Sequence, residues 1–184
     1  LTSQLLAFSR KKKFPVRPVN LNTLIQELIP LLSSAVKHSI TISHVADAQL
    51  PEFYGGVDQI KSALLNLGLN ARDAMKNGGA LTISTKTVDV TEAYRRKHGL
   101  TCPTGTFASV SVADTGTGIE PEAFKHLFEP FFTTKDEGKG TGMGLAAVFG
   151  IAQNHHGAVF AETELGSGTT FTMLFPVKML ETPA

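Results

Sequence analysis

The sequence predicts an α/β fold, a two-layer α/β sandwich in which about three helices cover one face of a mixed sheet. Helical periodicity and strand-like alternation follow one another along the chain in the order helix, strand, helix, two strands, loops, helix, two strands. This order is typical of a sheet covered by helices. The 184 residues, 42% of them hydrophobic, suit one compact domain with a core of its own.

The N-terminal segment differs from the rest of the chain. Apolar residues at positions 1, 5, 6 and 8 fit the tail of an amphipathic helix, and Pro15 and Pro18 end it. We interpret residues 11–19 as a linker and divide the chain into a helix end with linker (1–14) and a globular domain (15–180). Because the chain starts in mid-helix without an initiator Met, we expect it to be a piece of a longer protein.

The first half of the domain opens with a helix. Asn20 can cap it, since its side-chain oxygen can accept a hydrogen bond from the first turn, and about 17 helical residues should follow. A strand is predicted over residues 39–46, and a long helix over 57–76, which the glycine-rich residues 77–79 end. The buried face of the first helix should consist of Leu21, Leu24, Ile25, Leu28, Leu31 and Leu32.

The second half contains more strand-like segments. Residues 81–88 and 107–113 alternate as strands, separated by a polar, flexible insertion around 89–105. A helix should run from about Gly144 to His155. The last two strands are predicted over the ranges 158–162 and 169–176, joined by a turn at 165–168.

Charge and cysteine content exclude several classes of function. The formal net charge is +1, so no global field recruits nucleic acid, and we expect no nucleic-acid partner. We interpret the basic run 10–13 as a solvated part of the linker. Cys102 is the only cysteine, so no intrachain disulfide can form, which favours a reducing compartment. No apolar stretch reaches the roughly 20 residues of a membrane span.

A polar stripe on the long helix is the first candidate site. Asn66, Asn70 and Asp73 are spaced i, i+4, i+7 and therefore project from one face, between several leucines. Amide and carboxylate oxygens suit Mg²⁺ held together with phosphate. The alternative is an exposed face whose polar residues meet only water.

Two glycine-containing loops follow. Asp114 ends a strand before Gly116 and Gly118, so its carboxylate could accept a hydrogen bond from an exocyclic amine, although a tight turn would begin in the same way. Glycines alternate through residues 138–144 directly before a helix, which favours a phosphate cradle over a flexible linker. Between these loops, FEPFFTTK brings aromatic residues and Lys135, either as core or as part of a lid.

Taken in order, these segments resemble the catalytic domain of bacterial histidine kinases of the GHKL superfamily, over roughly residues 20–177. NLGLNARDAM is similar to the N box of that family, DTGTG and GKGTGMGL to its two glycine boxes, FEPFFTTK to its F box and GSGTTF to its terminal glycine motif. The F box and second glycine box are closest to the nitrogen-regulation and oxygen-sensing type. LLAFSR (5–10) is similar to the end of its dimerisation hairpin.

The resemblance implies ATP and Mg²⁺ as cofactors and an ATP lid around residues 138–144. It implies that Asn66 and Asn70 hold the metal and that Asn66 and Lys135 act in catalysis. The nucleotide would be bound by Asn66, Asn70, Asp73, Asp114, Gly116, Gly118, Ile119, Phe132, Gly140, Thr141, Gly142, Met143, Gly144, Leu145 and Thr169.

Within the superfamily, one position separates kinases from ATPases. The related ATPases carry a glutamate at the position of Asn66, where it activates water, and an amide cannot act as a general base. The resemblance therefore favours a kinase over a GHKL-type ATPase or a non-catalytic nucleotide-binding module. None of the six histidines is followed by an acid, as the family's phosphoacceptor is, so we expect the acceptor upstream of Leu1.

The partners implied by this resemblance are the protein's own dimerisation and phosphoacceptor hairpin and the receiver domain of a response regulator. The full-length protein would be a homodimer, and this chain the cytoplasmic part of a sensor that a membrane segment could anchor.

Overall fold

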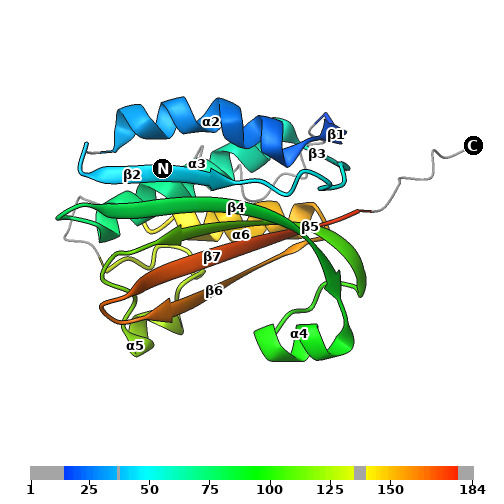
Figure 1. Ribbon diagram of the computed structural model, residues 1–184. Coiled ribbons are helices and arrows are strands. Elements are labelled where there is room, and N and C mark those ends of the chain that lie inside the picture. Colours follow the sequence, from blue (N-terminus) through cyan, green and yellow to red (C-terminus); the bar gives the residue numbers. More distant parts are fainter. Residues whose placement is uncertain (1–14, 37, 135–139, 178–184) are drawn as a thin grey trace, which may run out of the picture.

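A mixed five-stranded sheet forms one layer of the domain in the computed structural model, which describes residues 15–36, 38–134 and 140–177 (Figure 1). The strand order is β2-β4-β5-β7-β6; β2 runs parallel to β4, and the other neighbouring pairs are antiparallel. The five strands are β2 (Ile40–Val45), β4 (Gly79–Val90), β5 (Gly105–Asp114), β6 (Ala158–Glu164) and β7 (Gly168–Pro176).

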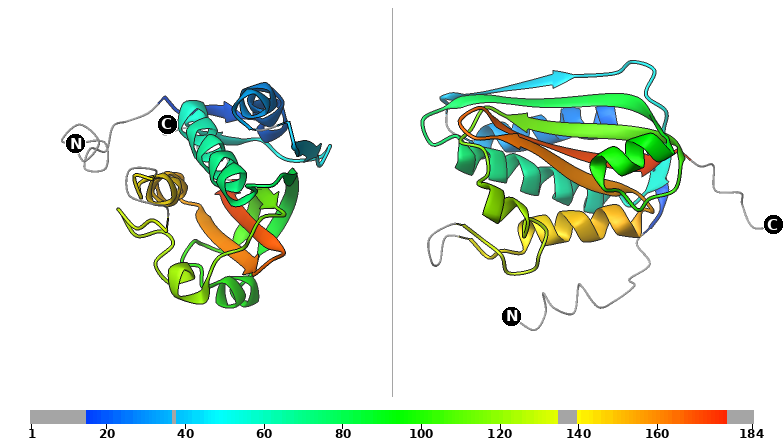
Figure 2. Two further views of the ribbon diagram at one scale, coloured as in Figure 1. Left: turned by 90° about the vertical axis from the view of Figure 1, so that its left-hand side faces the viewer. Right: turned by 90° about the horizontal axis from the view of Figure 1, so that it is seen from below.

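Three helices cover one face of this sheet: α2 (Leu21–Ala35), α3 (Val57–Ala74) and α6 (Gly144–Asn154) (Figures 1 and 2). Their apolar faces and the facing strand residues form the main core, which includes Leu28, Leu64 and Met173. The predicted α/β sandwich is therefore confirmed.

The sequence signals for α2 act largely as expected. The Asn20 side chain accepts a hydrogen bond from the Thr23 N–H at 3.1 Å and so caps the helix. The helix has 15 residues, close to the expected length. Leu31 was expected in the buried face, but it lies at the edge of the apolar stripe and is 50% exposed.

The insertion around residues 89–105 is not the flexible loop that its polarity suggested. It continues β4 to Val90 and then forms α4 (Glu92–His98), which the Thr91 hydroxyl caps by accepting from the Tyr94 N–H. A second apolar cluster lies on the sheet face opposite the main core, because its strand residues alternate with those of the main core. Its members are Val88, Val90, Cys102, Phe107, Ala158, Phe160 and Leu174, with Tyr94 and Leu100 packed against them.

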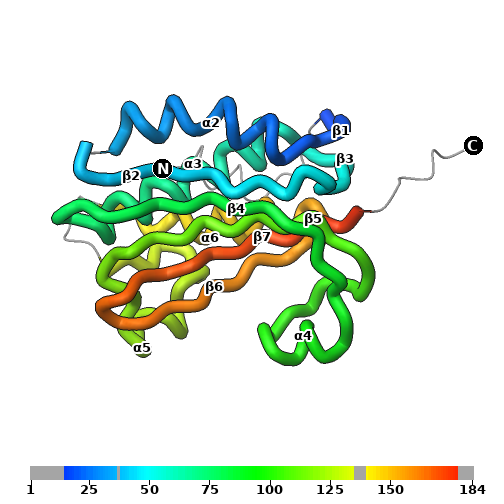
Figure 3. Tube along the Cα trace, viewed as in Figure 1, coloured from blue at the N-terminus to red at the C-terminus, as the bar shows by residue number. Residues whose placement is uncertain are grey.

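Three further short elements were not predicted. The segment interpreted as a linker contains β1 (Arg17–Val19), which pairs antiparallel with β3 (Phe53–Gly55). A single helical turn, α5 (Pro121–Phe124), follows the loop after β5. The tube in Figure 3 shows that β1 and β3 lie near the start of α2, whereas β2 begins near the other end of that helix.

Within the described part of the chain, no helix combines the length and apolarity that crossing a bilayer requires.

A buried histidine joins the end of α6 to the start of α3. His155 Nε2 accepts a hydrogen bond from the Gly56 N–H at 2.9 Å, and Nδ1 lies 2.7 Å from the Ile151 carbonyl oxygen. The ring packs edge-on against Phe175. Burial lowers the pKa of His155, and the hydrogen bond to Ile151 only partly opposes this. The neutral imidazole is therefore part of the folded state.

This arrangement predicts a loss of stability in mild acid. Below the ordinary histidine pKa of 6.5, the unfolded chain binds a proton at His155 that the folded chain does not. As the pH is lowered below 6.5, the free energy of unfolding should therefore decrease, by up to about 1.4 kcal/mol per pH unit for this group. Above pH 6.5 the contribution of this group should be constant. Urea unfolding at about pH 7.5 and about pH 5.5 measures the change.

His155→Gln keeps a side-chain acceptor that does not titrate, so its unfolding free energy should change less between these two pH values. His38→Gln, at an exposed histidine, is the matched control and should behave as the parent chain. An equal acid loss in His155→Gln and in the parent would show that His155 is not responsible.

Candidate functional site

One large cavity of about 830 Å³ opens between α3, the loop after β5, the segment around Phe132 and the start of α6. It brings together most of the residues singled out in the sequence, although they come from five separate segments. Those that line it are Asn66, Asn70, Asp73, Asp114, Gly118, Ile119, Phe132, Gly140, Thr141, Gly142, Gly144, Leu145 and Thr169.

Three candidates stand apart from this lining. Gly116 is buried behind Asp114, and Met143 is half-buried next to Thr141, whose hydroxyl accepts a hydrogen bond from the Met143 N–H. Lys135 lies outside the described residues. Sequence reasoning in turn missed several lining residues: Leu69, Arg72, Ala74, Lys76, Thr117, Ala123, Leu127, Thr133, Thr134 and Phe171. Helical spacing could have indicated Leu69, three residues after Asn66, and strand alternation from Thr169 could have indicated Phe171.

The amide stripe of α3 meets the start of α6 at one end of the cavity. Asn66 and Asn70 are both half-buried, and a Cβ added to Gly144 would lie 4.0 Å from Asn66 Cγ. The first turn of α6, whose first backbone N–H groups have no acceptor within the helix, thus lies beside the amide side chain of Asn66. This combination of helix dipole and donors favours an anion.

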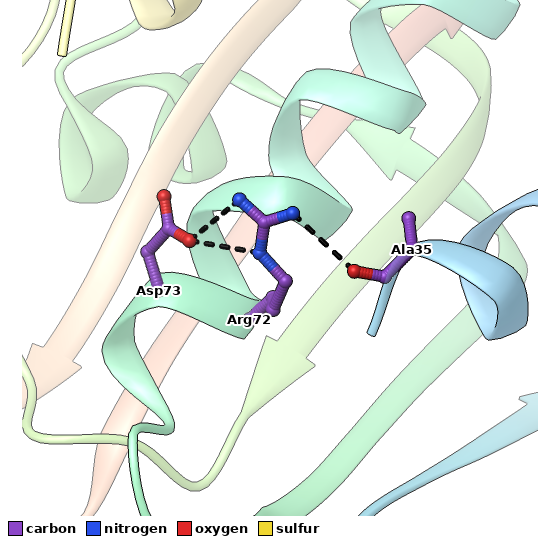
Figure 4. A network of polar contacts seen from close by, with 3 residues as sticks. All are labelled: Ala35, Arg72 and Asp73. Atoms are coloured by element: carbon purple, nitrogen blue, oxygen red, sulfur yellow. Dashed lines mark hydrogen bonds and ion pairs between the residues drawn. The ribbon is translucent and has the colours of Figure 1, made fainter. Parts of the chain in front are cut away.

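Asp73, the third residue of the stripe, is paired with its neighbour. Arg72 Nη2 and Nε lie 2.7 and 2.8 Å from Asp73 Oδ1, and Arg72 Nη1 donates to the Ala35 carbonyl at 3.3 Å (Figure 4). The guanidinium therefore joins the last turn of α3 to the end of α2. Both side chains are about one third exposed, so the pair adds little stability, but it lessens the negative charge that Asp73 brings to the cavity.

Asp114 lies at the opposite end of the cavity, where β5 ends. Its side chain is only 8% exposed, and Oδ1 accepts a hydrogen bond from the Gly116 N–H at 2.8 Å. Burial raises the pKa of Asp114, while backbone hydrogen bonds from Gly116 and Thr169 oppose that rise. A buried carboxylate with remaining acceptor capacity can bind a donor on a flat, mostly apolar ligand.

The turn between β6 and β7 packs directly against the loop after β5. The Gly166 N–H donates to the Thr117 carbonyl at 2.9 Å. Gly118 has φ +73°, and a Cβ there would lie 2.4 Å from the Glu164 carbonyl oxygen. Gly168 has φ +123°, and a Cβ there would lie 1.9 Å from the Asp114 carbonyl oxygen. Only glycine fits at these two positions.

Phe131 joins the aromatic segment to the glycine segment. Its N–H donates to the Gly142 carbonyl at 2.9 Å, and it adopts φ +67°, which is uncommon for a bulky residue. A Cβ on Gly142 would lie 2.3 Å from the Phe131 carbonyl carbon. Glycine at 142 therefore allows the two segments to close one side of the cavity.

The amide oxygens of Asn66 and Asn70 are hard ligands that could bind a metal ion in the cavity. Among the described residues, no group of three or more His, Cys, Asp or Glu side chains could hold a metal ion. The half-buried oxygens of Asn66 and Asn70 fit Mg²⁺ that shares its coordination with phosphate oxygens and water.

Known proteins are similar to this chain along most of its length. Residues 55–179 match the family model described as histidine kinase-, DNA gyrase B- and HSP90-like ATPase. The sensor kinase CckA of Brucella abortus (strain 2308) is 36% identical over 176 residues, which are 96% of this chain and 18% of CckA. The sensor histidine kinase ZraS of Escherichia coli (strain K12) is 32% identical over 180 residues, 97% of this chain and 35% of ZraS.

Solved structures give the same result for the fold. The catalytic domain of histidine kinase ThkA has a TM-score of 0.71 at 28% identity, covering 89% of this chain and 97% of that domain. Full-length ShkA in complex with AMPPNP has a TM-score of 0.75 at 24% identity, covering 99% of this chain and 36% of ShkA. ThkA in complex with the response regulator protein TrrA has a TM-score of 0.71 at 23% identity, covering 96% of this chain and 46% of ThkA.

The close packing at Gly168 predicts a large effect of one methyl group. Gly168→Ala forces a Cβ against the Asp114 carbonyl and should lower the free energy of unfolding by about 3 kcal/mol. Gly166→Ala is the matched control, because Gly166 also has a positive φ but has nothing within 4 Å of the added Cβ. It should cost about 1 kcal/mol. Urea unfolding of both variants measures the difference, and equal losses would contradict the prediction.

Proposed function

The chain belongs to the histidine kinase-, DNA gyrase B- and HSP90-like ATPase family, and on that premise we propose that it is the ATP-binding catalytic domain of a two-component sensor histidine kinase. It is homologous to the corresponding parts of the sensor kinases CckA and ZraS. Its reaction would be transfer of the ATP γ-phosphate to a histidine upstream of this chain. The observation that carries the proposal is a single cavity with an anion-binding end at α6 and a buried carboxylate at the other end.

The adenine base would lie at the Asp114 end. The buried carboxylate accepts a hydrogen bond from the exocyclic amine, which lies on a flat ring that Ile119 and Phe171 can contact. Thr169 lies directly opposite Asp114 in the pairing of β5 and β7. Gly116 and Gly118 shape the loop around the carboxylate, since the Gly116 N–H holds one of its oxygens.

The phosphates would lie at the other end. Residues Gly140, Thr141, Gly142, Met143, Gly144 and Leu145 precede or begin α6, and their backbone N–H groups can donate to phosphate oxygens. Asn66 and Asn70 would hold Mg²⁺, which neutralises phosphate charge when bound. Asp73 and Phe132 complete the wall, and we assign Lys135 to the γ-phosphate.

Asn66 favours transfer over hydrolysis. The residue lies beside the first turn of α6, where the terminal phosphate is expected, but its amide cannot remove a proton from water. An amide at this position leaves the γ-phosphate available to another nucleophile, here a histidine imidazole.

The acceptor and the other partners belong to the longer protein. This chain spans 18% and 35% of the lengths of CckA and ZraS, which leaves room for a dimerisation hairpin and a sensor. We assign residues 1–14 to the end of that hairpin and its linker, residues 15–180 to the catalytic domain, and both to the cytoplasm. A homodimer and a response regulator receiver domain complete the proposal, and ThkA has been solved with such a regulator.

Two exposed aromatic side chains beside the cavity suit a contact with the hairpin. Phe131 is 58% exposed and Phe149, on α6, is 41% exposed. Phe149 packs on Phe128 with ring centroids 5.7 Å apart, so it is held in place although open to solvent. Fixed, exposed aromatics are common anchors in protein interfaces.

ATP binding is the first test. Asp114→Ala and Asn70→Ala should each weaken binding of Mg²⁺–ATP at least about tenfold, because each removes a hydrogen-bonding or metal-binding group from the cavity. Isothermal titration calorimetry measures both. Asp89→Ala and Asn154→Ala are matched controls at exposed positions and should bind as the parent does. Unchanged affinity in both cavity variants would overturn the proposal.

Transfer itself is tested with the hairpin of the full-length protein supplied in trans. The parent domain should phosphorylate its histidine, with little release of free phosphate. Asn66→Glu adds a general base and should increase phosphate release by about tenfold or more while transfer to the hairpin falls. Rapid phosphate release by the parent domain, together with an unphosphorylated hairpin, would instead favour an ATPase.

A further inference from the structure

Three polar residues form a row across the sheet at the Asp114 end of the cavity. Asp114 on β5 pairs with Thr169 on β7, and Thr169 pairs with Thr163 on β6. Asp114 and Thr169 line the cavity, whereas Thr163 lies one strand further away, behind Thr169. Thr169 is only 4% exposed, so its hydroxyl must find its hydrogen-bond partners within this row or in a ligand.

The Thr163 hydroxyl has three neighbours. It accepts a hydrogen bond from the Ile119 N–H at 2.9 Å. It donates to the Gly168 carbonyl at 3.2 Å, and it lies 2.9 Å from the Thr169 hydroxyl.

All three contacts of the Thr163 hydroxyl can be hydrogen bonds at once in only one direction of the bond between Thr163 and Thr169. A hydroxyl has one proton and two lone pairs. The Gly168 carbonyl can only accept, so the Thr163 proton is directed there, and the Ile119 N–H occupies one lone pair of Thr163. The remaining lone pair faces Thr169, and therefore Thr169 donates its own proton to Thr163.

The direction of this bond determines which hydrogen-bonding groups a ligand finds beside Asp114. With its proton directed away from the cavity, the Thr169 oxygen offers only acceptor capacity beside the Asp114 carboxylate. Two neighbouring acceptors suit a ligand edge with an amino group, which has two N–H donors. They disfavour a carbonyl oxygen at the same place, because two acceptors then face each other without a proton between them.

We propose that Thr163 is a positioning residue for base specificity, which holds the Thr169 hydroxyl as an acceptor and so favours 6-aminopurine over 6-oxopurine nucleotides. This rests on the proposed nucleotide site and adds to it a residue outside the lining. Thr163 also supports the loop through Ile119, so removing it weakens binding of every nucleotide to some extent. The ratio of two affinities separates the two effects, since a purely structural role changes both affinities alike.

The test uses the whole domain and two Mg²⁺-bound, non-hydrolysable nucleotides, an ATP analogue and the matching inosine triphosphate analogue, whose base carries a carbonyl in place of the amine. Thr163→Val removes the hydroxyl and nearly keeps the shape of the side chain. Thr163→Ala removes the hydroxyl by a second, independent substitution. In both variants the Thr169 proton is free to turn towards the ligand. The preference for the ATP analogue should therefore fall about fivefold, as measured by calorimetry.

Two controls keep the preference of the parent. Thr163→Ser restores the hydroxyl. Thr172→Val removes a buried hydroxyl of β7 that lies 2.9 Å from the Ser111 hydroxyl, away from the cavity. Both should preserve the affinity ratio, whatever they do to stability.

The outcomes are distinct. An unchanged ratio in both hydroxyl-free variants, with ATP analogue still bound, overturns the role of Thr163 but leaves the nucleotide site intact. A changed ratio in Thr172→Val or Thr163→Ser also overturns it, because the effect would then be unspecific. If the parent domain binds neither nucleotide, the proposed function fails first and this inference falls with it.

Discussion

The register between β5 and β7 is the constraint on which the cavity depends. In this register Asp114 faces the helices and pairs with Thr169, and the carbonyl of Asp114 lies against Gly168, the residue before Thr169. A shift of one residue would turn the carboxylate to the other face of the sheet. The main core opposes such a shift, since the alternating residues Val110, Val112 and Phe171 would move with it.

The second constraint is the packing of α3 along α6. The two helices meet at Asn66 and Gly144 at the cavity, and His155 joins them at the far end by accepting from Gly56. The anion-binding end is thus set by contacts at both ends of the helix pair. An amide stripe on one helix would be of little use if the start of the other could slide along it.

Much of this arrangement could be predicted from the sequence, because it depends on patterns within a few residues. Asn20 indicates the start of α2, and the i, i+4, i+7 spacing on α3 indicates a polar stripe. Some of the residues that sequence reasoning missed depend on distant partners. Thr163 matters through a strand pairing and Arg72 through a carbonyl of α2, and nothing within a few residues of either indicates this. The helix α4 was missed because polarity outweighed the cap at Thr91, although Tyr94 and Cys102 bury apolar surface on the outer face of the sheet.

The hydrogen bond between the Phe131 N–H and the Gly142 carbonyl has a consequence for how this fold can vary. The bond joins the two ends of a segment, and the residues next to these ends, Phe132, Gly140 and Thr141, line the cavity. Closing a longer loop costs only about 0.6 kcal/mol for each doubling of its length. Insertions and deletions between the two residues are therefore inexpensive for the scaffold. The same pair of residues can therefore hold segments of different length, while Phe132, Gly140 and Thr141 keep their places in the cavity wall.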